Sequence, residues 1–227
     1  IQFLAISDAL LERAKTLQFR KKKILTRNTR HGLMAIGTNG YDVYSGQAFQ
    51  NLCFLLDPVG NDLYETGLGS SVDRAFCLQL DLAGDDVYRS NVPAAMFNSS
   101  FGLVCTYDLA GNDLYRTNDF CFSAFMGINL HQDLDGDDIY QSGLFSQGAA
   151  MCGIALLLDC AGNDSYQASV SAQGFGSTYG AGVLLDKEGA DNYSLGGKYY
   201  HEPLMPLDFI TLGQGMGLGL RPALAGG

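Results

Sequence analysis

The chain has 227 residues, of which 47% are hydrophobic and 17% charged, and its formal net charge at pH 7 is −10. This composition supplies enough apolar side chains for a core and too few charges for a disordered acidic tail. No stretch approaches the roughly 18 consecutive apolar residues that a membrane-spanning helix needs. Residues 1–30 hold eight basic and two acidic side chains, whereas the rest holds six basic and 22 acidic ones. The acidic body would repel phosphate, so nucleic acid is not an expected partner.

Residues 1–32 are predicted to form a helical leader. In SDALLERAKTLQFRKKKIL, Asp8 stands near the start, and Leu10, Ala14 and Leu17 recur at helical spacing. Because this segment precedes the first repeat, we expect the helix to cap the open edge of the repeat domain, since exposed strand edges need cover, or to link the repeat domain to something upstream. Its basic residues would then form a solvated helix face or, alternatively, contact an acidic surface such as the body of the same chain.

Residues 33–227 are dominated by an internal repeat. Six segments share the pattern Asp-x-x-Gly-x-Asp-x-Tyr, and their leading aspartates are 24, 27, 25, 26 and 27 residues apart. The six segments begin at Asp57, Asp81, Asp108, Asp133, Asp159 and Asp186. A degenerate copy that starts at Gly37 keeps Asp42 and Tyr44. A period this regular indicates stacked structural repeats.

Each repeat is predicted to contain two short strands joined by a tight turn. Apolar residues alternate before the leading aspartate, as Leu103 and Cys105 do before Asp108, and this alternation predicts a strand with those residues on its buried face. The Asp-x-x-Gly-Asn/Asp-Asp segment is typical of a turn, and a second strand runs through the tyrosine. The period therefore predicts an all-β fold, a parallel β-solenoid (β-helix) of about seven coils.

Stacking turns each position of the repeat into a column. The tyrosines, Tyr44 to Tyr193, would form an aromatic ladder that packs along the rod or, alternatively, presents a platform to sugars. The first acidic column contains the leading aspartates Asp57, Asp81, Asp108, Asp133, Asp159 and Asp186. The second acidic column contains Asp62, Asp86, Asp113, Asp138, Asp164 and Asp191. These twelve residues are the candidate metal ligands.

Neighbouring charges in such columns would repel one another. At a coil spacing of about 4.8 Å, each adjacent pair costs about 3.5 kcal/mol at an effective dielectric constant of about 20. Backbone N–H groups of the turns could offset this cost by holding each carboxylate in an Asx turn. Ca²⁺ ions bridging neighbouring coils could offset it instead. The sequence leaves both arrangements open and suggests no cofactor besides Ca²⁺.

Two resemblances to known repeats follow from these motifs. The turns GNDLY and GNDSY resemble the turn of RTX calcium-binding repeats, in which successive turns hold Ca²⁺, although the period here is about 25 residues instead of about nine. SQGAAMCGIALLLDCAGNDSY and AQGFGSTYGAGVLLDKEGADNY are similar to the unit QGxG…GLLLDxxGNDxY of bacterial tandem-repeat proteins, a group without an established activity. That similarity implies a repeat architecture and no particular chemistry. It also implies that the last coil is cut midway, so that further repeats of a longer chain are the expected partners.

One insertion interrupts the repeat between Tyr193 and Gln214. Insertions in solenoids often carry binding residues, although a packed spacer is the alternative. The candidate ligand loop consists of Lys198, Tyr199, Tyr200, His201 and Glu202. The column after the tyrosines contains Arg89 and Arg116, which we expect beside the carboxylates as charge compensation.

The sequence predicts a scaffold more readily than an enzyme. Six cysteines in apolar runs without CxxC spacing indicate buried thiols and no zinc site. A carbohydrate-active β-helix enzyme such as a polysaccharide lyase, the alternative, would need one irregular cluster of carboxylates and a base, whereas these residues recur in every coil. We therefore expect a non-enzymatic structural or binding scaffold of a bacterial envelope or secreted protein, periplasmic or extracellular, that binds carbohydrate or protein and is stabilised by calcium.

Overall fold

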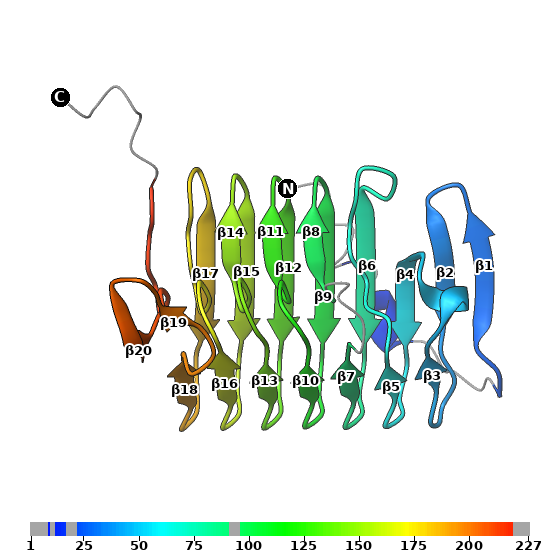
Figure 1. Ribbon diagram of the computed structural model, residues 1–227. Helices are drawn as coiled ribbons and strands as arrows, with labels where there is room; N and C mark the ends of the chain where they lie inside the picture. The colour runs from blue at the N-terminus through cyan, green and yellow to red at the C-terminus, as the bar shows by residue number, and fades with distance from the viewer. Residues whose placement is uncertain (1–8, 10–11, 17–21, 91–95, 220–227) are drawn as a thin grey trace.

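A computed structural model describes residues 9, 12–16, 22–90 and 96–219. Its strands wind into a parallel β-solenoid, so the predicted fold class is confirmed (Figure 1). The predicted seven coils were slightly too many, because the regular coil of about 26 residues repeats for only about five turns. These turns correspond to the intervals between Asp57 and Asp186, while the coil before Asp57 is shorter and the one after Asp186 is interrupted by the insertion.

Three sheets form the sides of the rod. The first sheet consists of β1 (Leu25–Thr29), β2 (Gly32–Ile36), β4 (Leu52–Asp57), β6 (Phe76–Asp81), β9 (Leu103–Asp108), β12 (Ile128–Asp133), β15 (Ile154–Asp159) and β17 (Ala181–Asp186). The second consists of β3 (Val43–Tyr44), β5 (Leu63–Tyr64), β7 (Val87–Arg89), β10 (Leu114–Arg116), β13 (Ile139–Gln141), β16 (Ser165–Ala168) and β18 (Asn192–Leu195). The third is formed by β8 (Asn98–Ser100), β11 (Ser123–Phe125) and β14 (Ala149–Met151). The remaining described elements are a short 3₁₀ helix, η1 (Gln47–Phe49), the hairpin of β19 (Tyr200–His201) and β20 (Met205–Phe209), and a helical stretch at residues 9 and 12–15.

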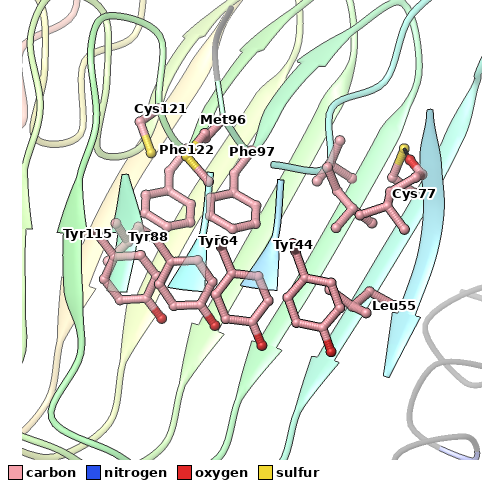
Figure 2. Close-up of a cluster of buried hydrophobic side chains, with 14 of the residues drawn as sticks. Tyr44, Leu55, Tyr64, Cys77, Tyr88, Met96, Phe97, Tyr115, Cys121 and Phe122 are labelled. Atoms are coloured by element: carbon pink, nitrogen blue, oxygen red, sulfur yellow. Dashed lines mark hydrogen bonds between the residues drawn. The ribbon is translucent and has the colours of Figure 1, made fainter. Parts of the chain in front are cut away.

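The repeats stack in register, as the sequence predicted. Asp81 of β6 pairs with Asp108 of β9, and Tyr88 of β7 pairs with Tyr115 of β10. Seven tyrosine rings form a continuous ladder with centroids 4.3 to 4.9 Å apart. Figure 2 shows four of these rings side by side, with their hydroxyl groups pointing the same way. All the rings except that of Tyr193 are at most 2% exposed, so the ladder is core packing and offers no platform to sugars.

The apolar alternation before each aspartate lies on the outer face of the first sheet. It is buried on β6 and β9, as at Leu78 and Cys105, but its assignment to the buried face was wrong for β15 and β17. Ile154 and Val183, five and three positions before an aspartate, are 48% and 41% exposed. Val104 and Leu157, at even positions, are fully buried. The reason is that the leading aspartate itself points inward, and side chains alternate between the two faces of a strand.

The N-terminal helix also lies elsewhere than expected. Residues 9 and 12–15 are helical, and the buried Ala14 packs against outward side chains of β4, β6 and β9, including Leu78 and Cys105. The helix therefore covers a face of the first sheet, while β1, which pairs antiparallel with β2, covers the edge. The leader is thus only partly helical; Asp8, Leu10 and Leu17 lie outside the described residues.

Candidate metal site in two buried carboxylate columns

The two acidic columns line one inner corner of the coil. Leading aspartates end the strands of the first sheet, and each second-column aspartate stands one residue before a strand of the second sheet. The turn between them brings both carboxylates inside. Ten of the twelve candidate ligands are at most 3% exposed. Asp186 and Asp191, in the last coil, are half-buried.

The close stacking of these turns depends on glycine. Gly111 has a φ of 158°, and a Cβ atom there would lie 1.7 Å from the carbonyl oxygen of Gly84 in the preceding coil. No side chain fits at that distance, so glycine is needed wherever one turn lies on another. Gly40, in the first turn, has no heavy atom within 4 Å of the corresponding position.

The first acidic column is held by the tyrosine ladder. The hydroxyl group of Tyr64 lies 2.6 Å from Oδ2 of Asp81 and 3.1 Å from Oδ2 of Asp57, the carboxylates of two successive coils. Since a hydroxyl group has one proton, it donates to one of the two carboxylates at a time. The same arrangement recurs at Tyr88, Tyr115 and Tyr140.

The second acidic column is held by backbone amides. The N–H group of Asp62 donates to Oδ1 of Asp86 over 2.6 Å, and the N–H group of Asp86 donates to Oδ1 of Asp113 over 2.6 Å. This pattern continues to Asp191. Backbone support for the carboxylates was expected, but it comes from the preceding coil and not from an Asx turn within one coil.

Each column leaves oxygens without a hydrogen-bond partner. In the first column these are Oδ1 atoms, and in the second they are Oδ2 atoms. The buried, unpartnered oxygens belong to Asp57, Asp133, Asp159 and Asp186, and to Asp62, Asp113, Asp138 and Asp164. Carboxylate oxygens of these columns and of Asp42 meet in four groups within the described residues, whose ligand atoms lie within 4.8 Å of one another: Asp42, Asp57 and Asp62; Asp108, Asp113 and Asp133; Asp138, Asp159 and Asp164; and Asp164, Asp186 and Asp191. The groups are compatible with metal binding.

The electrostatics of this corner disfavour bare carboxylates. Burial and the charge of neighbouring aspartates raise the pKa of Asp57 to about 9 and that of Asp113 to about 11. The ion pairs of the described chain involve Glu12, Glu65 and Asp119, none of which belongs to the columns. A buried charge needs a partner or a proton. Either protons or metal cations must therefore neutralise most of these groups.

The two arginines predicted to compensate the columns do not reach them. Arg89 forms an ion pair with Glu65 over 2.7 Å, and Arg116 donates to Gln141 over 2.8 Å. Each follows an inward-pointing tyrosine on its strand and so points outward. A cleft of about 840 Å³ opens near Arg74, but Arg89, Arg116 and His201 do not line it.

The candidate ligand loop lies within a hairpin at the C-terminal end of the rod (Figure 1). Lys198 approaches Asp119 to 3.6 Å, and the ring of Tyr200 stacks on that of Phe209. His201 and Glu202 lie in this hairpin and belong to none of the acidic groups. The hairpin exposes Leu207, at 89%, so the insertion does not converge on a compact site.

Two residues of the interior were missed or undervalued in the sequence. Asp42 belongs to one of the acidic groups; its place in the degenerate first repeat was the available signal. His131 was not singled out by the sequence; it is buried, and its Nδ1 hydrogen-bonds Thr106 over 2.7 Å. Burial lowers the pKa of His131 to about 3, so the ring is neutral.

The chain matches no protein-family model, no curated protein and no solved structure at a significant level. In the part of the chain that the structure describes, no helix has the length and apolar character to cross a membrane. The cysteines are free thiols, four of them buried.

Proposed function

We propose that this chain is a structural or binding scaffold of a secreted or periplasmic bacterial repeat protein, without catalytic activity, and that Ca²⁺ ions in the acidic columns stabilise its coils. The observation that carries the proposal is that eight of the twelve candidate ligands keep a buried oxygen without a hydrogen-bond partner. An unpaired buried carboxylate is costly. One divalent cation per coil would balance the two carboxylates that each coil contributes.

The donor chemistry of the groups fits calcium. Ca²⁺ takes carboxylate and carbonyl oxygens, usually six to eight of them. Each group offers three carboxylates, and histidine and cysteine take part in none of those found in the described residues. Zinc prefers those nitrogen and sulfur donors. Bound Ca²⁺ would supply positive charge between successive coils, and the aspartates would hold it there.

The repetition of the site supports a scaffold over an enzyme. Hydrolytic or lyase chemistry would need a base beside an open carboxylate, whereas the columns are buried and Arg89 and Arg116 face away from them. The outer surfaces of the coils are left to partners, for which we propose carbohydrate, protein or further repeats of a longer chain.

Calcium content and thermal stability of the purified chain test the proposal. We expect bound calcium by elemental analysis after dialysis, and a higher Tm in Ca²⁺ than in EDTA. Asp113→Asn keeps the shape of the side chain and loses one ligand charge. It should reduce both the calcium content and the shift in Tm, while the exposed Asp135→Asn should change neither.

Protons are the competing way to neutralise the columns, and the same variants separate the two. An asparagine resembles a protonated aspartic acid, so Asp113→Asn would keep or raise the Tm if protons neutralise the columns. A chain that retains no calcium and melts identically in Ca²⁺ and EDTA would overturn the calcium role. Hydrolysis or elimination of a polysaccharide by the purified chain would overturn the scaffold.

A further inference from the structure

The cleft of about 840 Å³ lies toward the N-terminal end of the rod, where the coils are less regular. Its walls are formed by the turn between β1 and β2, the residues that follow η1 and the loop after β5. The third sheet begins only at β8, so no described strand of that sheet covers the preceding coils. The volume of the cleft falls within the range of about 300 to 1,000 Å³ that is usual for ligand pockets.

The cleft is lined mainly by polar residues. Gln50 and Asn98 contribute amide groups, and Thr66 and Ser71 contribute hydroxyl groups. Among the described residues of the lining, Met96 is the only large apolar one, and it is 2% exposed. Amide and hydroxyl groups can exchange hydrogen bonds with the hydroxyl groups of a sugar, whereas apolar ligands and peptide side chains need apolar walls. The lining therefore favours a saccharide.

One arginine holds the walls of the cleft together. Arg74 is half-buried, and its Nε and Nη2 atoms donate to the carbonyl oxygen of Gly69 over 2.8 and 2.6 Å. Its Nη1 atom donates to the carbonyl oxygen of Gln50, in the preceding coil, over 3.1 Å. The guanidinium group thus joins the loop after β5 to the residues after η1. A site that is formed before its ligand arrives loses less free energy on binding.

The cleft also carries positive charge on an otherwise acidic rod. Arg30, in the turn between β1 and β2, lines the cleft together with Arg74. Neither arginine takes part in the ion pairs of the described residues. Of the two acidic residues in the lining, Glu65 is paired with Arg89 over 2.7 Å, and Asp73 is exposed to solvent.

The strand beside the cleft adds to this positive field. Residues 22–31, which include β1, contain four lysine or arginine side chains and no acidic one. A concentration of one sign of charge attracts ligands of the opposite sign, and a guanidinium group binds a carboxylate through two parallel hydrogen bonds. We propose that the cleft binds an acidic saccharide, whose carboxylate pairs with Arg30 and whose hydroxyl groups bind the amide and hydroxyl side chains. This inference rests on the binding role proposed above.

The binding of three trimers to the full chain tests the ligand class. Trigalacturonate carries carboxylates and hydroxyl groups, galactotriose carries hydroxyl groups alone, and triglutamate carries carboxylates on a peptide. Isothermal titration calorimetry should give a Kd for trigalacturonate at least about tenfold below the Kd of the other two. Equal affinity for triglutamate would overturn the proposal in favour of an acidic peptide. Equal affinity for galactotriose, or no binding of trigalacturonate, would overturn it as well.

Two variants locate the site. Arg30→Gln removes a charge from the cleft and leaves the hydrogen bonds of Arg74 intact, so it should weaken trigalacturonate binding about tenfold and leave galactotriose binding unchanged. Arg116 lies on the second sheet and does not line the cleft, so Arg116→Gln should change neither. Equal weakening by both variants would overturn the site, because it would show attraction to the whole surface.

The same samples separate this inference from the proposed scaffold. Mass spectrometry should recover the trimer intact after incubation with the chain. Cleavage would overturn the scaffold without catalytic activity but would support the cleft as the place where the saccharide binds. A chain that binds calcium but no trimer would overturn the cleft and would leave the calcium-stabilised scaffold supported.

Discussion

Single aspartates of this solenoid place carboxyl groups in the interior of the coil, where most proteins have apolar side chains. Asp108 ends a buried strand, and it is only 3% exposed because its side chain points into the coil. The tyrosine that follows seven residues later, Tyr115, approaches its Oδ2 to 3.0 Å. Hydrogen bonds to an ionised acceptor are about twice as strong as those between neutral groups. The aspartate and the tyrosine of each repeat therefore form one structural unit, although they are two separate positions of the sequence motif.

Removing one hydroxyl group tests this pairing. Tyr115→Phe keeps the stacked ring and leaves the carboxylates of Asp108 and Asp133 with one donor fewer. We expect a loss of about 1.5 to 3 kcal/mol in the free energy of unfolding, measured by urea denaturation. Tyr179→Phe is the control, because Tyr179 is 92% exposed. Equal stability of the two variants would contradict a supporting role for the hydroxyl group.

The elements of the fold were predictable where the repeat fixes them. In-register pairing such as Asp81 with Asp108 follows from the period alone, since equal units stack like on like. Which face of the strand points inward could not be predicted. The outward positions hold many apolar residues, such as Ile154, whereas some inward positions hold polar ones, such as Thr106 and His131. Polar side chains can line a core when they hydrogen-bond one another. No spacing rule shows which will do so.

The candidate site was predictable in its members but not in its bonds. The acidic columns follow from the repeated Asp-x-x-Gly-x-Asp, but the burial of their carboxylates does not. The amide that binds Asp113 belongs to Asp86 of another coil. The helix at Ala14 was recognisable from its spacing. The face of the sheet that the helix covers could not be predicted, because it depends on which outward residues need cover.

The turn is the element whose stacking is easiest to break. In Gly111→Ala the new Cβ atom would meet the carbonyl oxygen of Gly84 at 1.7 Å, so two coils must separate or the turn must distort. We expect a loss of at least about 3 kcal/mol in unfolding free energy, at the upper end for single substitutions, or an insoluble chain. Gly40→Ala occupies the same turn position with open space around it and should remain within about 1 kcal/mol of the parent chain. Similar losses in both would show that close stacking of the turns is not what requires glycine.

At the scale of the whole molecule, the net charge of −10 conceals a rod that carries its acids inside as well as outside. Acids on a surface are solvated and screened by salt, but those of the two columns are shielded from water. The charge state of the rod's interior therefore depends on what is bound there. Protons and calcium compete for the same oxygens, which links stability to pH and to calcium together.

The sign of this linkage can be predicted for the calcium-free protein. The pKa is raised to about 9 at Asp57 and to about 11 at Asp113, whereas aspartates of an unfolded chain titrate near about 3.9. Between these values the folded protein binds more protons than the unfolded one. Stability is then fully present below about pH 4 and falls as the pH rises toward 9 and beyond. In EDTA we expect a higher Tm at pH 5 than at pH 8.

Thermal melts from pH 5 to pH 8, in EDTA and in Ca²⁺, check this expectation. Saturating Ca²⁺ should flatten the dependence, because the cation replaces protons at the higher pH. Asp113→Asn removes one titrating group and should reduce the slope in EDTA, whereas Asp135→Asn, at an exposed position of the turn, should leave it unchanged. A Tm that rises from pH 5 to pH 8 in EDTA would contradict this expectation, because it would mean that the column carboxylates are ionised in the folded rod without a cation. Ionisation there is energetically costly, since ten of these carboxylates are at most 3% exposed.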